Sequence, residues 1–221
     1  MNVAAFTKTY EGRLVLNMPG FELEEGCITA VIGANGSGKS TMAKVISGIE
    51  ASDQKKKVLP AGITVGYMPQ KNYAFRMTAE KNIFLNGNDK NKAGELMEAL
   101  QLAPLAKQRA KKLSGGETAK MALVRLLMGD YELLILDEPT AAMDMESTLA
   151  SEMLIRKHVK ESGCTVLLIT HNLQQARRLA DQVIFFCKGE LAEAGSAKKL
   201  LDDPEKEETR KFLDFYGMKA L

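Results

Sequence analysis

Residues 33–40 read Gly33-Ala34-Asn35-Gly36-Ser37-Gly38-Lys39-Ser40, and this octapeptide is the most informative stretch of the chain. It matches the pattern GxxxxGK[ST], a loop between a strand and a helix whose backbone N–H groups cradle phosphates. The flanking segments supply that context, because an apolar run at 27–32 precedes the loop and helix formers at 41–46 follow it. Glycines let phosphates approach the backbone closely, and a helix N-terminus adds partial positive charge. The stretch therefore predicts a phosphate-binding loop at the end of a buried strand.

The side chains of this loop have predicted roles of their own. Lys39 is placed to reach the β- and γ-phosphates of a nucleotide, and the Ser40 hydroxyl is placed to bind Mg²⁺. The candidate phosphate-binding residues are Gly33, Asn35, Gly36, Ser37, Gly38, Lys39, Ser40 and Thr41.

Apolar runs along the rest of the chain indicate an α/β fold. The runs at 27–32, 133–136, 165–169 and 183–187 are rich in Val, Ile and Leu and lack polar alternation. Such runs are typical of parallel strands that helices cover on both faces. Because the segments between them have helical spacing, we predict a wound α/β sheet.

Two segments do not follow the strand–helix alternation. Short, turn-punctuated pieces at 3–9, 14–17 and 21–24 predict an antiparallel edge sheet attached to the main sheet. The stretch 71–125 has weak strand character and good helix formers, including 92–101, so it predicts a helical insertion.

The length fits a single domain that carries a sub-domain. We expect one domain over residues 1–221, with a core of about 1–70 and 126–221 around the helical insertion. The charge-dense tail at 202–211 predicts a solvated helix.

Charge and cysteine content exclude several classes of protein. The 30 basic and 28 acidic side chains nearly cancel, which argues against a nucleic-acid-binding surface. The basic run 55–57 is interpreted as a solvated turn. Cys27, Cys164 and Cys187 form no CxxC pair, so we interpret them as core residues in a reducing compartment.

Neither a signal peptide nor a membrane span is expected from the sequence. The N-terminus has no basic region followed by an apolar one, and the longest apolar runs are strand-sized. We therefore expect a cytoplasmic chain that reaches a membrane only through a partner.

A second motif, Leu-Leu-Ile-Leu-Asp-Glu-Pro at 133–139, is a buried strand that ends in two acids. Open α/β sheets bind ligands at the carboxyl ends of their strands, so Asp137 is expected to reach a Mg²⁺ ion there. Glu138 is placed to accept a proton from an attacking water, or to orient it.

A third motif, Leu-Ser-Gly-Gly-Glu at 113–117, opens a helix that leads to Leu127. Ser114 and Glu117 have the spacing of a capping box. Capping gives no reason for Gly115 and Gly116, which are poor helix formers. Close approach of a phosphate to a bare helix N-terminus would explain both glycines.

Together and in this order, the three motifs resemble the nucleotide-binding subunit of an ATP-binding cassette (ABC) transporter, over residues 1–216. The resemblance implies a P-loop NTPase fold and an ATPase that uses Mg²⁺. It implies that Glu138 is catalytic and that Ser114, Gly115 and Gly116 contact ATP. It also implies Mg²⁺ ligands at Ser40 and Asp137.

The resemblance assigns further roles by order along the chain. Gln70, after a strand, corresponds to a sensing glutamine that is catalytic and a Mg²⁺ ligand. His171 corresponds to a catalytic switch histidine, and Tyr10 to an aromatic that stacks on adenine. Asp144 lies in a loop through which two nucleotide sites communicate, with Met143 in place of the family's usual leucine.

In the family two copies pack head to tail, and each ATP lies between the loop of one copy and the LSGGE helix of the other. The implied partners are therefore a second ABC subunit, identical or paired, and a separate integral membrane permease, with no nucleic acid and no direct substrate contact. The implied location is cytoplasmic and peripheral, on the inner face of the cell membrane.

Within the family the pattern most resembles importer subunits for oxyanions such as tungstate, molybdate or phosphate. Residues 73–76 are candidates for the permease contact, although they could instead belong to the core of the helical insertion. The alternative function is an ABC ATPase of the iron–sulfur assembly type, with no role in transport. The presence of Glu138 and His171 argues against a scaffold without turnover.

Overall fold

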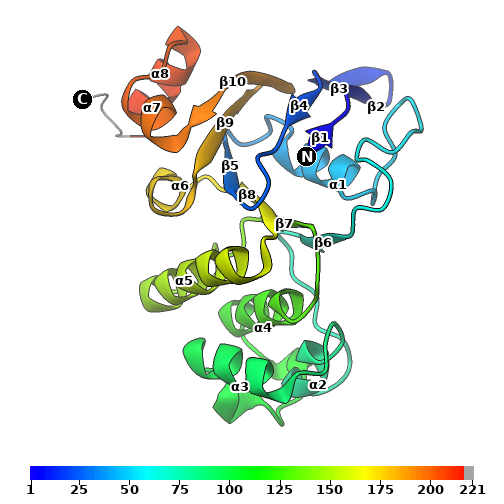
Figure 1. Ribbon diagram of the computed structural model, residues 1–221, viewed down its shortest axis with the longest axis vertical. Helices are drawn as coiled ribbons and strands as arrows, with labels where there is room; N and C mark the ends of the chain where they lie inside the picture. The colour runs from blue at the N-terminus through cyan, green and yellow to red at the C-terminus, as the bar shows by residue number, and fades with distance from the viewer. Residues whose placement is uncertain (217–221) are drawn as a thin grey trace.

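A six-stranded sheet forms the centre of this computed structural model, which describes residues 1–216 (Figure 1). Its strands lie in the order β10-β9-β5-β8-β7-β6. β10 is antiparallel to β9, and the other neighbours are parallel. The strands are β5 (Ile28–Ile32), β6 (Val65–Met68), β7 (Leu133–Asp137), β8 (Thr165–Ile169), β9 (Gln182–Cys187) and β10 (Glu190–Ser196).

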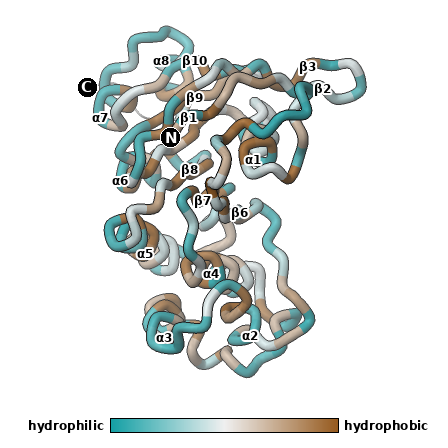
Figure 2. The backbone as a smooth tube through the Cα atoms, turned by 45° about the vertical axis from the view of Figure 1, so that its right-hand side comes forward, coloured by the Kyte–Doolittle hydropathy of each residue, from teal (hydrophilic) through white to brown (hydrophobic). Residues whose placement is uncertain are grey.

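Helices cover both faces of the sheet, which confirms the predicted α/β class. In β5, Val31 packs with α1 (Lys39–Ile46) on one face. Ala30 and Ile32 pack on the other face with α6 (Leu173–Leu179) and α7 (Ala197–Asp202). Every residue of β5, β7 and β8 is buried, as continuous apolar runs predict. Figure 2 shows this hydrophobic centre among more hydrophilic outer segments.

The N-terminal strands correct the prediction of one attached edge sheet. β1 (Asn2–Val3) pairs with β4 (Phe21–Glu22), and β2 (Phe6–Tyr10) pairs with β3 (Arg13–Met18), as two separate two-stranded sheets. The break falls at Ala4, whose N–H donates to the loop residue Val58. The attachment to the main sheet includes packed apolar side chains and a 2.9 Å hydrogen bond from the Asn17 N–H to the Gly189 carbonyl, and the Asn17 side-chain amide also donates to Glu190 Oε1 at 2.9 Å.

Between β6 and β7 the chain is helical, as predicted for this stretch. Its elements are α2 (Ala79–Ile83), α3 (Lys90–Ala99), η1 (Ala103–Leu105), η2 (Ala110–Lys112) and α4 (Gly115–Leu127). α3 begins two residues earlier than the predicted helix because the Asp89 carboxylate caps it, accepting from the Asn91 and Lys92 N–H groups. These helices lie in the lower half of Figure 1, beside α5 (Met145–Ser162). The exact boundaries of the insertion stay a prediction.

The C-terminal segment differs from the single solvated helix predicted at 202–211. The chain breaks at Pro204 between α7 and α8 (Glu207–Phe215), and α8 buries Thr209 and Leu213. Proline has no backbone N–H and disfavours a helical residue before it, which explains the break. The expected domain continues to 221, but residues 217–221 lie outside the described residues.

Other sequence expectations have mixed outcomes. The basic run 55–57 is an exposed turn, as predicted. Of the cysteines, Cys164 is buried, but Cys27 and Cys187 are half-buried and so only partly belong to the core. Within residues 1–216, no helix is both long enough and apolar enough to cross a bilayer.

Candidate active site

A cavity of about 400 Å³ lies where the phosphate loop, β7 and β8 end. It brings loop residues together with Gln70, Glu138 and His171, as the sequence predicts. The residues that line it are Val15, Asn35, Gly36, Gly38, Lys39, Ser40, Thr41, Gln70, Glu138, Ile169 and His171. Val15 of β3 was missed by the sequence analysis, because a lone valine in a short strand gives no signal.

The backbone of the loop requires glycine for two different reasons. At Gly33 a Cβ atom would lie 2.1 Å from the Phe186 carbonyl oxygen, so another strand's backbone excludes a side chain. Gly36 has φ +76° and open space around it, so there conformation alone favours glycine. The loop is thereby held against β9 at Gly33 and carries no side chain at Gly36.

Lys39 points back along the loop and is 6% exposed. Its Nζ donates to the carbonyl oxygens of Gly33 and Ala34, both at 2.8 Å. Burial lowers the pKa of Lys39, and the charges of Glu138 and Asp137 act in the opposite direction. The ammonium group therefore lies at the loop, where it can meet the phosphates of a nucleotide.

Asp137 ends β7 and is 2% exposed. Burial raises the pKa of its carboxyl; a hydrogen bond from Ser40 lowers it, and the charge of Glu138 raises it. Among the described residues, Asp137 Oδ1 has no hydrogen-bond partner. An unpaired carboxylate oxygen beside a hydroxyl fits Mg²⁺, which proteins hold through one or two carboxylates together with substrate phosphates.

Glu138 has an uncommon backbone, with φ +51° in a residue other than glycine. Its N–H donates to the Ile169 carbonyl at 2.9 Å, which fixes it beside β8. Its Oε2 lies 2.5 Å from Nδ1 of His171, and the Glu138 side chain is 9% exposed. The carboxylate is therefore held at the cavity by a histidine that follows β8, the neighbouring strand of the sheet.

Tyr10 is not among the residues that line the cavity. Its hydroxyl donates to Glu50, and the Lys8 ammonium lies 4.9 Å from the centre of its ring. Burial, the hydrogen bond to Glu50 and the charge of Glu50 raise its pKa to about 12. Its adenine-stacking role stays a prediction.

Ser114, Gly115 and Gly116 also lie outside the cavity lining. The capping box forms, since the Ser114 N–H donates to Glu117 Oε2 at 2.7 Å and the Glu117 N–H to Ser114 Oγ at 3.2 Å. A Cβ on Gly116 would lie 2.7 Å from the Ala142 carbonyl oxygen, so the chain itself requires that glycine. This corrects the interpretation that both glycines need a phosphate to explain them. Only Gly115, which faces open space, lacks a reason within the chain.

Beside the cavity, Gln175 is a buried residue that the sequence analysis also missed. Its amide donates to Thr140 Oγ1 at 2.9 Å and to Glu152 Oε1 at 3.2 Å, which ties the segment after Glu138 to α5 and α6. No pattern marked this glutamine, because its partners come from distant parts of the sequence.

Comparisons with known proteins agree with this geometry. Residues 16–141 match the family described as ABC transporter. The chain is 37% identical over 210 residues to the tungstate uptake system ATP-binding protein TupC of Peptoclostridium acidaminophilum, covering 88% of this chain and 97% of that protein. It is 35% identical over 198 residues to a zinc import ATP-binding protein ZnuC from Chelativorans, covering 88% and 70%.

Solved structures show the same fold. An ATP binding subunit of an ABC transporter matches with a TM-score of 0.79 and 22% identity, covering 90% of each chain. A dimeric ATP-binding cassette in a post-hydrolysis state, bound to ADP and Pi, matches with a TM-score of 0.76 and 23% identity, covering 89% of this chain and 99% of that one. The predicted resemblance is thus confirmed, and the chain belongs to the ABC transporter family as an ATP-binding subunit and ATPase.

Proposed function

We propose that this chain powers an importer by head-to-tail dimerisation driven by ATP, coupled to a separate membrane permease at the inner face of the cell membrane. The observation that carries the proposal is the split site. Lys39, Glu138 and His171 share one cavity, whereas Ser114 and Gly115 lie outside its lining. The relatives described above, tungstate and zinc uptake proteins, support the direction of transport.

Within the cavity the proposed chemistry is attack of water on the γ-phosphate, which breaks the bond from the γ-phosphorus to the bridging oxygen and releases ADP and inorganic phosphate. The loop N–H groups and Lys39 would hold the phosphates and offset their charge. Glu138, positioned by His171, would accept the proton of the attacking water or orient it. Gln70 lines the same cavity and would contact both the water and the metal.

Ser40, Asp137 and Gln70 would hold the Mg²⁺ ion, which supplies positive charge at the β- and γ-phosphates when bound. Among the described residues there is no cluster of three or more His, Cys, Asp or Glu side chains that could hold a metal. This agrees with a Mg²⁺ ion held largely by the phosphates of its nucleotide.

A second copy would complete the site. The exposed N-terminus of α4 has a capped first turn and open space at Gly115, a surface suited to a phosphate brought by another chain. A two-fold symmetric pair would close two such sites at once, because each copy offers both surfaces. A non-identical ABC subunit that carries both a phosphate loop and an LSGGE helix could complete the site in the same way.

The permease contact is proposed at Tyr73 and Phe75. These side chains are 61% and 42% exposed, and their rings pack edge to face at 5.1 Å. Arg125 donates to the Tyr73 carbonyl at 3.2 Å and lies 5.3 Å from the Phe75 ring centre. Their exposure disfavours the alternative that these aromatics belong to the core of the helical insertion. Beside them a cavity of about 210 Å³ opens between β6 and α4.

Sizing chromatography on a Glu138→Gln background tests the proposal. Loss of the general base is expected to slow hydrolysis roughly 10²-fold or more while ATP binding persists. The ATP-bound Glu138→Gln protein should then elute as a dimer. Adding Ser114→Arg should abolish the dimer without weakening ATP binding by the monomer. An unchanged dimer yield would contradict the split site.

Recovery with membranes separates the importer from the alternative. An importer subunit is expected to co-purify with a permease, whereas an iron–sulfur assembly ATPase would stay in the soluble fraction. Near-normal phosphate release by Glu138→Gln would instead remove Glu138 from the catalytic role.

A further inference from the structure

Two buried oxygen atoms on the neighbouring strands β6 and β7 lack a hydrogen-bond partner within residues 1–216. They are the hydroxyl of Tyr67 and Oδ1 of Asp137. A buried polar atom without a partner is destabilising, so such atoms in a native fold call for an explanation. The position of both atoms on neighbouring strands provides such an explanation.

Tyr67 and Asp137 lie on the same face of neighbouring strands. β6 runs parallel to β7, with Tyr67 opposite Ile135. Asp137 follows Ile135 by two residues and therefore points to the same face, because side chains alternate along a strand. Tyr67 and Ile135 pack in one apolar cluster on that face. The two side chains therefore lie on the same face of adjacent strands, near the carboxyl end of β7.

The chemistry of the two groups is complementary. A protonated phenol is a hydrogen-bond donor, and a carboxylate oxygen has two acceptor sites. A bond from Tyr67 would therefore leave Asp137 free to accept from Ser40 and to meet a cation.

We propose that Tyr67 is a positioning residue for the Mg²⁺ site, donating its hydroxyl to Asp137 and fixing the orientation of that carboxylate. This inference rests on the proposed role of Asp137 as a metal ligand. Groups that orient the ligands of a metal typically change its affinity 10- to 100-fold when removed. Tyr67→Phe deletes the hydroxyl and keeps the ring that packs against Ile135.

The test is a Mn²⁺ titration followed by electron paramagnetic resonance, on Glu138→Gln protein saturated with ATP. Tyr67→Phe is expected to weaken Mn²⁺ binding by about 10-fold or more, while the ATP affinity measured in EDTA is unchanged. Tyr131→Phe is the matched control. It removes a phenol hydroxyl near the opposite end of β7, where Tyr131 accepts a 2.9 Å hydrogen bond from Asn86. Its metal affinity should match that of the parent.

Adding Asp137→Asn separates the inference from the proposed function. Asp137→Asn should itself lose Mn²⁺ affinity, and Tyr67→Phe should then cause little further loss, because the two act as one unit. Unchanged affinity in Tyr67→Phe alone would overturn the inference and leave the proposed function intact. If Tyr67→Phe weakens ATP binding in EDTA as much as it weakens Mn²⁺ binding, the role of Tyr67 is purely structural, and the inference is overturned. If Asp137→Asn has no effect, the proposed metal site fails, and the inference fails with it.

Discussion

Gly33 and Gly36 lie three residues apart in the phosphate loop, yet an added methyl group should affect them differently. Gly33→Ala places a Cβ 2.1 Å from the Phe186 carbonyl oxygen, so the loop or β9 must move. Gly36→Ala meets no atom within 4 Å and bears only the cost of a left-handed backbone, about 1–2 kcal/mol. We expect Gly33→Ala to be the more destabilising and to lose most ATP binding. Urea unfolding and ATP titration check this, and equal losses in both variants would contradict it.

Prediction from sequence worked best for residues whose position is set by their immediate neighbours. The predicted order of strand, loop and helix at 27–46 is confirmed and brings Lys39 and Ser40 to the cavity, because adjacent residues determine that geometry. Their roles toward phosphate and Mg²⁺ stay predictions. The 2.5 Å contact between Glu138 and His171 joins separate strands. The spacing of residues along the sequence does not predict this contact unless the order of the strands in the sheet is known. Tyr67 was passed over for the same reason, since its relation to Asp137 exists only in the folded sheet.

At the scale of single elements, α4 offers a direct test of its two first-turn glycines. Gly115→Ala adds a methyl group in open space and should stabilise the helix by up to about 1 kcal/mol. Gly116→Ala clashes with the Ala142 carbonyl oxygen, 2.7 Å from the new Cβ, and should destabilise the chain. Thermal unfolding checks this prediction, since the melting temperature should rise in Gly115→Ala and fall in Gly116→Ala. If Gly115→Ala also weakens the ATP-bound dimer, the open space beside Gly115 is needed for contact with a second copy of the chain.

α5 should make the stability of the fold depend on pH through His158. This side chain is 8% exposed, and its Nε2 has no partner among residues 1–216. Burial and the charge of Lys92 lower its pKa, while Asp130 and Glu161 act in the opposite direction. An unfolded histidine titrates near about pH 6.5. As pH falls through this value, the unfolded chain binds the proton first, so folding stability decreases.

We therefore expect His158→Gln to flatten the stability profile between about pH 7 and pH 5. Urea unfolding at several pH values measures this directly. An identical slope in the wild type and His158→Gln would contradict the assignment.

Elements without a clean periodic pattern were the ones that sequence analysis missed. β10 contains two glutamates, four small residues and a bulge between Leu191 and Glu193, so no apolar run marks it. It forms because pairing with β9 satisfies its backbone. The separation of the N-terminal strands into two sheets also depends on a contact distant in sequence. The Ala4 N–H donates to Val58 of a loop, and the strand pairing is interrupted there.

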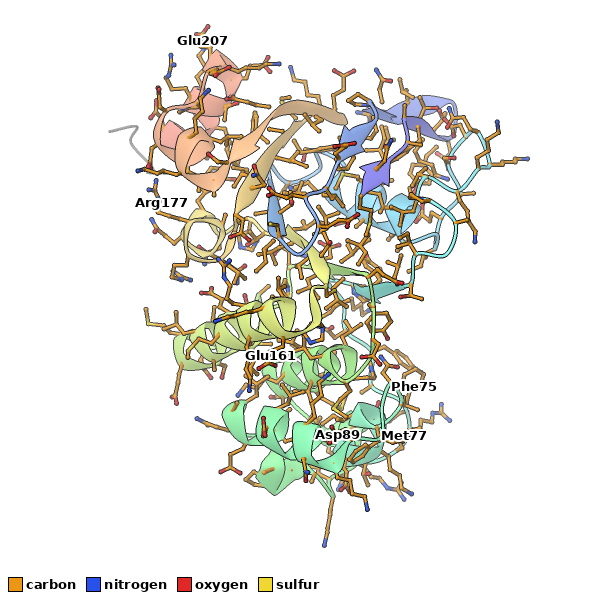
Figure 3. All side chains as sticks on the ribbon, in the orientation of Figure 1. Phe75, Met77, Asp89, Glu161, Arg177 and Glu207 are labelled. Atoms are coloured by element: carbon orange, nitrogen blue, oxygen red, sulfur yellow. The ribbon has the colours of Figure 1, made fainter. Side chains whose placement is uncertain are left out.

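At the scale of the whole molecule, the nucleotide cavity and the proposed permease contact are separate, so they should respond separately to mutation. Phe75 projects from the segment before α2 in the lower half of Figure 3. Phe75→Ser should leave ATP hydrolysis by the purified chain unchanged and reduce the fraction recovered with membranes. Met153→Ser, on α5, removes a side chain that is 73% exposed and should change neither quantity. Equal membrane recovery of both variants would place the permease contact elsewhere.

The left-handed backbone of Glu138 has an evolutionary consequence. Glycine, asparagine and aspartate accept a φ of +51° more readily than glutamate does. Replacing Glu138 by glycine, asparagine or aspartate would therefore relax the backbone, whereas Glu138→Gln would not. Selection for stability alone would favour such a replacement, so a glutamate is expected to persist here only where its proposed role as general base is needed.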